Sequence, residues 1–210
     1  PRFEAKTAAH KSDVDVVFVV QDTGKKPIPP RGTYAGWVEK FRKGEAFSAR
    51  AGQVVVVPFG GKGGAANVAF VGLGPVAEVT IEKVRQSGAY ALSRLASDKF
   101  ATAQIMVDTL LEIKGIEKEG VTSERLVHAF AEGFAMSSYK SDKYRKTSKD
   151  QVVGPAKVFF FSKDKDLRSS LASSVADAIV VAECMSVTRD WSNEPSNYGT
   201  PEYYAKEAQR

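Results

Sequence analysis

The strongest constraint on the fold is the alternation of β-branched apolar runs with segments of helical period. The runs "DVDVVFVV" at 13–20, "NVAFVGLG" at 67–74 and "AKVFFFS" at 156–162 are almost continuously apolar, which is typical of strands buried on both faces. Between them, apolar residues recur every three or four positions, as in an amphipathic helix. Strands separated by helices need crossover connections, so the pattern predicts an α/β fold with a mixed, largely parallel sheet flanked by helices.

The remaining elements follow from the same two periods. "QVVVVPF" at 53–59 is expected to form a hairpin with 67–74, and "TAQIMVDTL" at 102–110 is expected to be a strand. The proline-rich "QDTGKKPIPPRG" at 21–32 predicts a loop rather than more sheet. Helices are expected after Pro75, from an N-cap at Thr122 or Ser123, and from Asp166 to about Val187, the last with Leu167, Leu171, Val175, Ile179 and Ala182 facing inward.

Composition excludes several classes of protein. Hydrophobic residues make up 43% and charged residues 26% of the 210, which is ordinary for a globular protein. No apolar run of about 20 residues and no secretory signal is evident in the sequence, so a cytoplasmic protein without a membrane segment is expected. The single cysteine, Cys184, cannot form an internal disulfide, which is typical of a reducing compartment.

The net charge of +5 is mild, and its densest basic stretch is "YKSDKYRKTSK" at 139–149. Five cations there surround one acid, Asp142. We expect a solvated loop, with a patch for nucleic acid or an acidic partner as the alternative.

Two glycine-rich segments are candidates for phosphate-binding loops. "VGLGPVA" at 71–77 fits a relaxed dinucleotide fingerprint, but the acid that should bind a ribose about 20 residues later is missing, and Asp108 lies 34 positions past Gly74. "GGKGGAAN" at 60–67 surrounds Lys62 with glycines, yet no Ser or Thr follows the lysine to hold magnesium. A tight turn and a hairpin tip are the expected structures, with an anion cradle as the alternative for the second loop.

No catalytic or metal-binding residue is evident. His10 and His128 are isolated from each other and from acidic clusters, so neither is expected to be a metal ligand. Cys184 lies in an apolar helical stretch, where a small buried side chain is expected rather than an activated nucleophile.

The last stretch, "TRDWSNEPSNYGTPEYYAKEAQR" at 188–210, resembles the junction segment of the leucine aminopeptidase (M17) family, whose pattern is approximately R-D/E-L-x-N-x-P-x-N-x-x-T-P. Trp191 replaces the usual leucine. The positions that match are Arg189, Asp190, Asn193, Pro195, Asn197, Thr200 and Pro201.

Earlier segments agree in the same order. "VAFVGLG" is similar to the family strand ending in V-G-L-G, and "AEGFAMSSYKSDKYRK" at 131–146 resembles E-G-x-x-L-x-x-Y-x-F-D-x-Y-K. In the second segment Ser141 replaces phenylalanine and Met136 replaces leucine, as expected of a divergent member. The matching positions are Glu132, Gly133, Tyr139, Asp142 and Tyr144.

The resemblance implies an N-terminal, macro-domain-like α/β domain at 1–165, a linker helix at 166–192 and the start of a catalytic domain at 193–210. It implies a full-length leucyl aminopeptidase that removes N-terminal amino acids from peptides with two divalent metal ions, manganese or zinc, and that forms a homohexamer. The metal ligands of the family lie further along the chain, so no catalytic, metal or cofactor-binding residue is assigned here and this stretch alone is expected to be inactive. The partners implied are its own catalytic domain and the peptide bound there.

The seven junction residues are expected to be structural, because Asn and Asp side chains bond nearby backbone and a Thr-Pro pair begins a helix. Two alternatives stay open. One is a macro-like module that binds a nucleotide, phosphate or nucleic acid, and the other is a purely structural domain that supports the hexamer.

Overall fold

In the computed structural model of the chain, the described residues are 2–6, 11–43, 46–59, 65–116, 120–141, 143–144 and 154–209. Seven strands in these residues form one sheet. The strands are β1 (Arg2–Lys6), β2 (Val14–Gln21), β3 (Pro27–Ile28), β4 (Val54–Pro58), β5 (Asn67–Pro75), β6 (Thr102–Met106) and β7 (Lys157–Phe161). The helices are α1 (Ala35–Lys43), α2 (Ile81–Ser97), α3 (Asp108–Leu111), α4 (Ser123–Met136), α5 (Arg168–Ser192) and α6 (Pro201–Ala208), with a 3-10 turn, η1 (Val76–Glu78).

The sheet is mixed and mostly parallel, as the sequence predicts. Its order is β1-β7-β6-β2-β5-β4, and β3 pairs with β2 outside this path. β1, β7, β6, β2 and β5 run parallel, whereas β4 is antiparallel to β5 and forms the expected hairpin with it. Every residue of β2 is buried, because this strand lies in the middle of the sheet with both faces covered. The α/β fold class is therefore confirmed.

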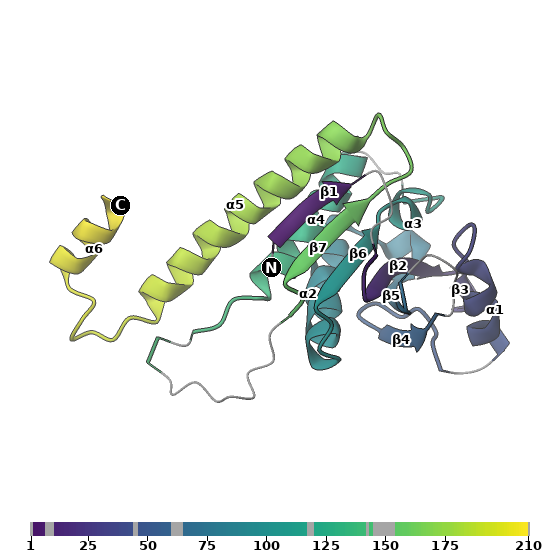
Figure 1. Cartoon of the computed structure of the whole chain (residues 1–210), viewed down its shortest axis with the longest axis horizontal. Helices are drawn as coiled ribbons and strands as arrows, with labels where there is room; N and C mark the ends of the chain where they lie inside the picture. Colours follow the sequence, from purple (N-terminus) through teal and green to yellow (C-terminus); the bar gives the residue numbers. More distant parts are fainter. Residues whose placement is uncertain are drawn as a thin grey trace.

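Each face of the sheet has its own apolar core. On one face, alternate residues of β2 such as Val16 and Phe18 pack with α2, α4 and α5. On the other, Val17 and Val19 pack with α1 and with Phe47. Figure 1 shows α4 and α5 over the same side of the strands and α1 apart from them, near β3.

Helices α2 and α4 cross in contact because two glycines meet there. A Cβ on Gly133 would lie 1.8 Å from the carbonyl oxygen of Arg85, and one on Gly88 would lie 2.3 Å from that of Phe130. Arg85 also donates from Nε to Glu132 at 3.0 Å. Glu132 and Gly133, which belong to the segment 131–146 that resembles the family pattern, therefore join these two helices.

Four sequence expectations were wrong or incomplete. Pro27 and Ile28 form a short strand where a loop was expected, since the loop turns back and pairs with the end of β2. The strand expected at 102–110 ends at Met106, and α3 begins at Asp108. The Asp108 carboxylate accepts hydrogen bonds from Ser162 Oγ at 2.6 Å and from the Lys163 amide at 3.0 Å. β1 and α1 were not expected, because a five-residue edge strand and a nine-residue helix carry weak periodic patterns.

α5 continues to Ser192, past the helix end expected near Val187, and extends beyond the sheet. Its N-terminal half is buried at Leu171, Val175 and Ala178 against α4 and β1, while the rest leads away toward α6 (Figure 1). Val180 and Val187 are 57% and 49% exposed. By length and composition alone α5 could cross a membrane, with a mean hydropathy of 1.5 over 18 residues, of which 28% are buried inside this fold.

Cys184 was expected to be buried, and this expectation is wrong. The side chain is exposed, because it lies on the half of α5 that extends past the domain.

Candidate functional site

The end of α5 is tied to the segment that follows α4. Arg189 donates from Nη1 to the carbonyl oxygen of Met136 at 3.0 Å, and its guanidinium lies 5.5 Å from the ring centre of Tyr139. The Tyr139 hydroxyl donates to Asp190 Oδ1 at 2.8 Å and accepts from Asn193 Nδ2 at 3.3 Å. Three residues of the family pattern therefore converge on one tyrosine 50 positions earlier in the chain.

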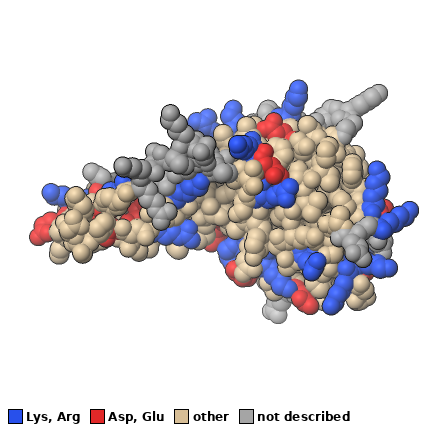
Figure 2. Space-filling model, turned by 90° about the horizontal axis from the view of Figure 1, so that it is seen from below, with Lys and Arg blue, Asp and Glu red and all other residues tan. Residues whose placement is uncertain are grey.

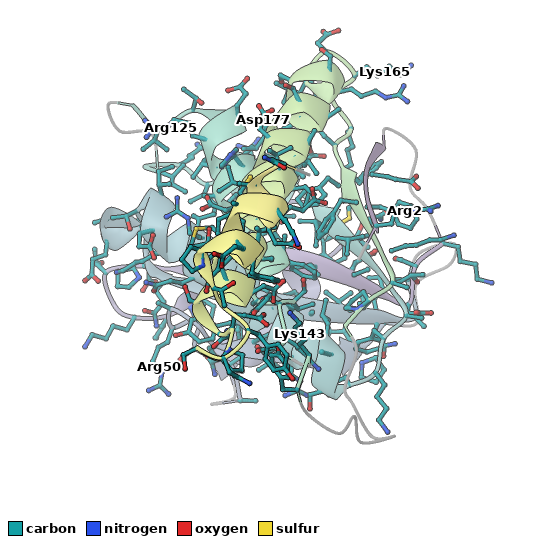
Figure 3. The ribbon with its side chains drawn as sticks, turned by 90° about the vertical axis from the view of Figure 1, so that its left-hand side faces the viewer. Arg2, Arg50, Arg125, Lys143, Lys165 and Asp177 are labelled. Atoms are coloured by element: carbon teal, nitrogen blue, oxygen red, sulfur yellow. The ribbon has the colours of Figure 1, made fainter. Side chains whose placement is uncertain are left out.

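A second contact joins Lys143 and Tyr144 to Glu194, just after the end of α5. Lys143 donates to Glu194 Oε2 at 2.6 Å, and the Tyr144 hydroxyl donates to the other carboxylate oxygen. The hydrogen bond from Lys143, followed by that from Tyr144, lowers the pKa of Glu194. The hydrogen bond to Glu194 in turn raises the pKa of Lys143. Figure 3 shows Lys143 at the lower end of the α5–α6 region. We call Tyr139, Lys143, Tyr144 and the stretch 189–194 the junction cluster.

The rest of the motif shapes the turn into α6. The Pro195 carbonyl accepts from the amides of Tyr198 and Gly199 at 2.9 and 2.8 Å. Thr200 caps α6 by accepting from the Tyr203 amide at 3.3 Å, and Pro201 is its first residue. Asn197 is exposed. The geometry is that of a structured turn, and the assignment of these seven residues to a domain junction stays a prediction.

The described residues do not fit a metal centre. No three His, Cys, Asp or Glu side chains of this part of the chain lie close enough to share an ion. His128 Nδ1 lies 3.6 Å from Glu132 Oε2 within one helix, and His10 is outside the described residues. The two divalent ions implied by the resemblance therefore have no ligand set here.

The structure describes the first glycine loop, at 71–77, whereas residues 60–64 of the second lie outside the described residues. Gly74 has a positive φ of 81° at the end of β5, where only glycine is relaxed, and a Cβ on Gly72 would lie 2.3 Å from the Arg50 carbonyl oxygen. These glycines serve turn geometry and close packing against 49–51, as the tight-turn hypothesis expected. Asp108 is occupied by Ser162 and Lys163, and Lys62 lies outside the described residues.

The basic stretch 139–149 is described only in part. Lys143 is bound to Glu194, whereas Asp142, Arg145, Lys146 and Lys149 lie outside the described residues. On the face shown in Figure 2, Lys and Arg are spread over the globular part with Asp and Glu among them. On this face, the described Lys and Arg residues do not form a continuous basic track of the kind that follows a nucleic-acid backbone.

A buried carboxyl in the middle of the sheet was missed by sequence reasoning. Asp15 on β2 is 4% exposed and accepts hydrogen bonds from Tyr34 at 3.0 Å, Ser12 at 3.1 Å and Gln104 at 3.2 Å. Burial raises the pKa of the Asp15 carboxyl, against the hydrogen bonds, which lower it. Burial and the nearby Asp15 charge raise the pKa of Tyr34 as well. The signal available in the sequence was an acid within an otherwise apolar strand.

A cavity of about 330 Å³ opens at the carboxyl ends of the strands. Pairing between β2 and β6 stops at Val16 and Ile105, whereas β2 continues beside β5 to Gln21. The Phe18 amide, left without a partner on β6, donates instead to Thr109 Oγ1 at 3.1 Å. The cavity lies where the two strands separate, between α3 and the segment after β3. Its lining residues are Phe18, Val20, Ile28, Pro29, Pro30, Arg31, Thr109, Glu112, Ile113 and Lys114.

Fold and site together define a class of protein: an α/β domain with a mostly parallel sheet and a long C-terminal helix whose end is anchored back on the domain. Comparison with known sequences then places the chain. The sequence model of the cytosol aminopeptidase family, N-terminal domain, matches residues 16–148, more than half of the chain. The chain belongs to the cytosol aminopeptidase family.

Individual relatives agree. A probable cytosol aminopeptidase of Rickettsia bellii is 29% identical over 161 residues, covering 76% of this chain and 30% of the relative. Among solved structures, the bottromycin maturation enzyme BotP in complex with Mn superposes with a TM-score of 0.65 at 26% identity, covering 94% of this chain and 35% of that one. A tomato leucine aminopeptidase variant superposes with a TM-score of 0.69 at 19% identity, covering 99% of this chain and 41% of that one. This likeness supports the fold. The chain thus spans about a third of the length of these proteins.

Proposed function

We propose that these 210 residues form the non-catalytic N-terminal unit of a leucyl aminopeptidase, a hydrolase that removes N-terminal amino acids from peptides. The observation that carries the proposal is the match of residues 16–148 to the N-terminal domain of the cytosol aminopeptidase family. The names of the relatives support a cytoplasmic location for the whole protein. In this proposal 1–165 is the N-terminal domain, 166–192 the linker helix and 193–210 the start of the catalytic domain.

The partner proposed for this unit is its own catalytic domain. The outer half of α5 carries a strip of apolar side chains with large exposed fractions, which a helix seldom shows to water over this length. They are Val180, Val181, Met185 and Val187, at 57%, 38%, 38% and 49%. The junction cluster fixes the direction of the chain at the end of this strip, so the segment after α6 starts beside it. We propose the apolar strip as the docking surface for the catalytic domain.

The remaining parts of the proposal come from the family resemblance. The full-length protein would hold two divalent ions, manganese or zinc, through residues further along the chain, where the family has its metal ligands. It would assemble as a homohexamer and bind its peptide substrate in the catalytic domain.

Docking on α5 is tested by Val181→Asp in a longer protein that continues through the length of the relatives. Burying the introduced charge, and losing an apolar contact of about 1.5–3 kcal/mol, should lower the melting temperature and the rate of leucyl p-nitroanilide hydrolysis. In the 210-residue chain the same substitution should leave the melting temperature almost unchanged, since Val181 is exposed there.

The matched control is Ala176→Asp, which places the same charge on an exposed position of the same helix, nearer the domain. It should be neutral in both proteins. Equal behaviour of Val181→Asp in the short and long proteins would rule out docking on this strip.

A further inference from the structure

The cavity at the carboxyl ends of β2 and β6 occupies the place in an open α/β sheet where ligands usually bind. The chain passes from β2 to β4 and β5 on one side, and then crosses to β6 on the other. Such a topological switch point leaves a crevice because the connections depart in opposite directions. The volume of about 330 Å³ is within the range of small-molecule sites.

The floor and walls of the cavity are apolar. Phe18 and Val20 of β2 form buried parts of the lining, and Ile28 is 38% exposed with its side chain beside the opening. Pro29, Pro30 and Ile113 complete this surface. The Thr109 hydroxyl is already used, since it accepts from the Phe18 amide and donates to the Met106 carbonyl oxygen at 2.7 Å. The interior therefore suits a branched aliphatic group rather than a polar one.

The polar groups of the cavity are the three charged side chains Arg31, Glu112 and Lys114. In the described part of the chain none of the three makes a hydrogen bond or an ion pair. A guanidinium can hold a carboxylate through two parallel hydrogen bonds, and a carboxylate can hold an ammonium group. Two cations and one anion beside an apolar pocket complement a zwitterion that carries an apolar side chain.

We propose that this cavity binds a free amino acid with a branched aliphatic side chain, such as leucine. Arg31 and Lys114 bind its carboxylate, Glu112 binds its ammonium group, and the walls formed by Val20, Ile28 and Ile113 receive its side chain. A polyphosphate fits less well, because Glu112 repels it and the walls offer it no hydrogen bonds. In the proposed function such an amino acid would also be a product of the parent enzyme, and this link rests on that function. The proposed binding does not depend on it.

The test is isothermal titration calorimetry of the 210-residue chain with leucine. We expect saturable binding with a dissociation constant in the millimolar range or below. Leucinamide, which lacks the carboxylate, and N-acetyl-leucine, which lacks the ammonium group, should each bind at least about fivefold more weakly, because each loses a charge-assisted contact. Glycine should bind about tenfold more weakly, since it has no side chain for the apolar walls.

Variants assign the contacts. Arg31→Gln should weaken leucine binding and reduce the preference for leucine over leucinamide, because Lys114 alone then binds the carboxylate. Glu112→Gln should remove the preference over N-acetyl-leucine. Arg168→Gln, an exposed arginine that does not line the cavity, should bind as the unchanged chain does. Circular dichroism of each variant shows whether it is folded.

Absence of saturable leucine binding, equal binding of leucine and leucinamide, or binding of ADP-ribose in place of leucine would each overturn the proposal. None of these results depends on peptide hydrolysis. The proposed amino-acid binding and the proposed enzymatic function can therefore be disproved separately.

Discussion

Gly133→Ala is expected to lower the free energy of unfolding by about 3 kcal/mol or more, at the upper end of what overpacking usually costs. The new Cβ would lie 1.8 Å from the carbonyl oxygen and 2.7 Å from the carbonyl carbon of Arg85, both backbone atoms of α2. Backbone cannot rotate out of the way as a side chain can, so α2 and α4 must move apart. Urea denaturation followed by circular dichroism measures the loss.

The control for this substitution is Gly36→Ala in α1. No atom lies within 4 Å of its added Cβ, and alanine is favoured over glycine in a helix by up to about 1 kcal/mol. Gly36→Ala should therefore be neutral or stabilising. A Gly133→Ala chain with the stability of the unchanged protein would contradict the close crossing of α2 and α4.

Asp15→Ala is expected to cost about 3 kcal/mol or more, because it leaves three buried side-chain donors without their acceptor. These donors are the hydroxyls of Tyr34 and Ser12 and the amide of Gln104. Asp98→Ala, which removes a surface ion pair with Arg94, should cost less than about 1 kcal/mol. Equal losses in the two variants would show that the Asp15 hydrogen bonds do not stabilise the fold.

The pH dependence tests the burial of Asp15 separately. Because burial raises the folded pKa of Asp15 above its unfolded value, the folded chain binds this proton more tightly than the unfolded chain does. The favourable contribution of the protonated group is present below the unfolded pKa of about 3.9 and is lost as the pH rises through the folded pKa. The stability of Asp15→Asn relative to the unchanged chain should therefore increase from about pH 4 upward. A constant difference from pH 4 to pH 8 would contradict a raised pKa.

Periodicity was sufficient to predict the central elements. The apolar runs at β2, β5 and β7 and the three-to-four spacing of α2 and α4 each have one dominant pattern. Residue type limited the cap of α4 to Thr122 or Ser123, and the structure shows that it is Thr122. β1 was missed because its place depends on pairing with β7, more than 150 residues away. The local sequence does not indicate such a distant pairing partner.

The junction cluster was predicted only in part, for the same reason. The motif at 189–201 could be matched to a family, but its contacts with Tyr139 and Lys143 join segments about 50 residues apart. The exposure of Cys184 was missed because an apolar helical pattern does not show which part of a helix extends past the sheet that it packs against. The cavity could not be predicted, since it depends on where β2 and β6 separate in space.

Hydrolysis of leucyl p-nitroanilide decides whether these residues form the non-catalytic unit of an aminopeptidase. The 210-residue chain and a longer protein covering the length of the relatives are assayed side by side, each with manganese and with zinc. We expect turnover by the longer protein and none by the chain above the metal-only blank. Metal-dependent turnover by the purified chain, or an inactive longer protein that is folded and metal-loaded, would contradict it.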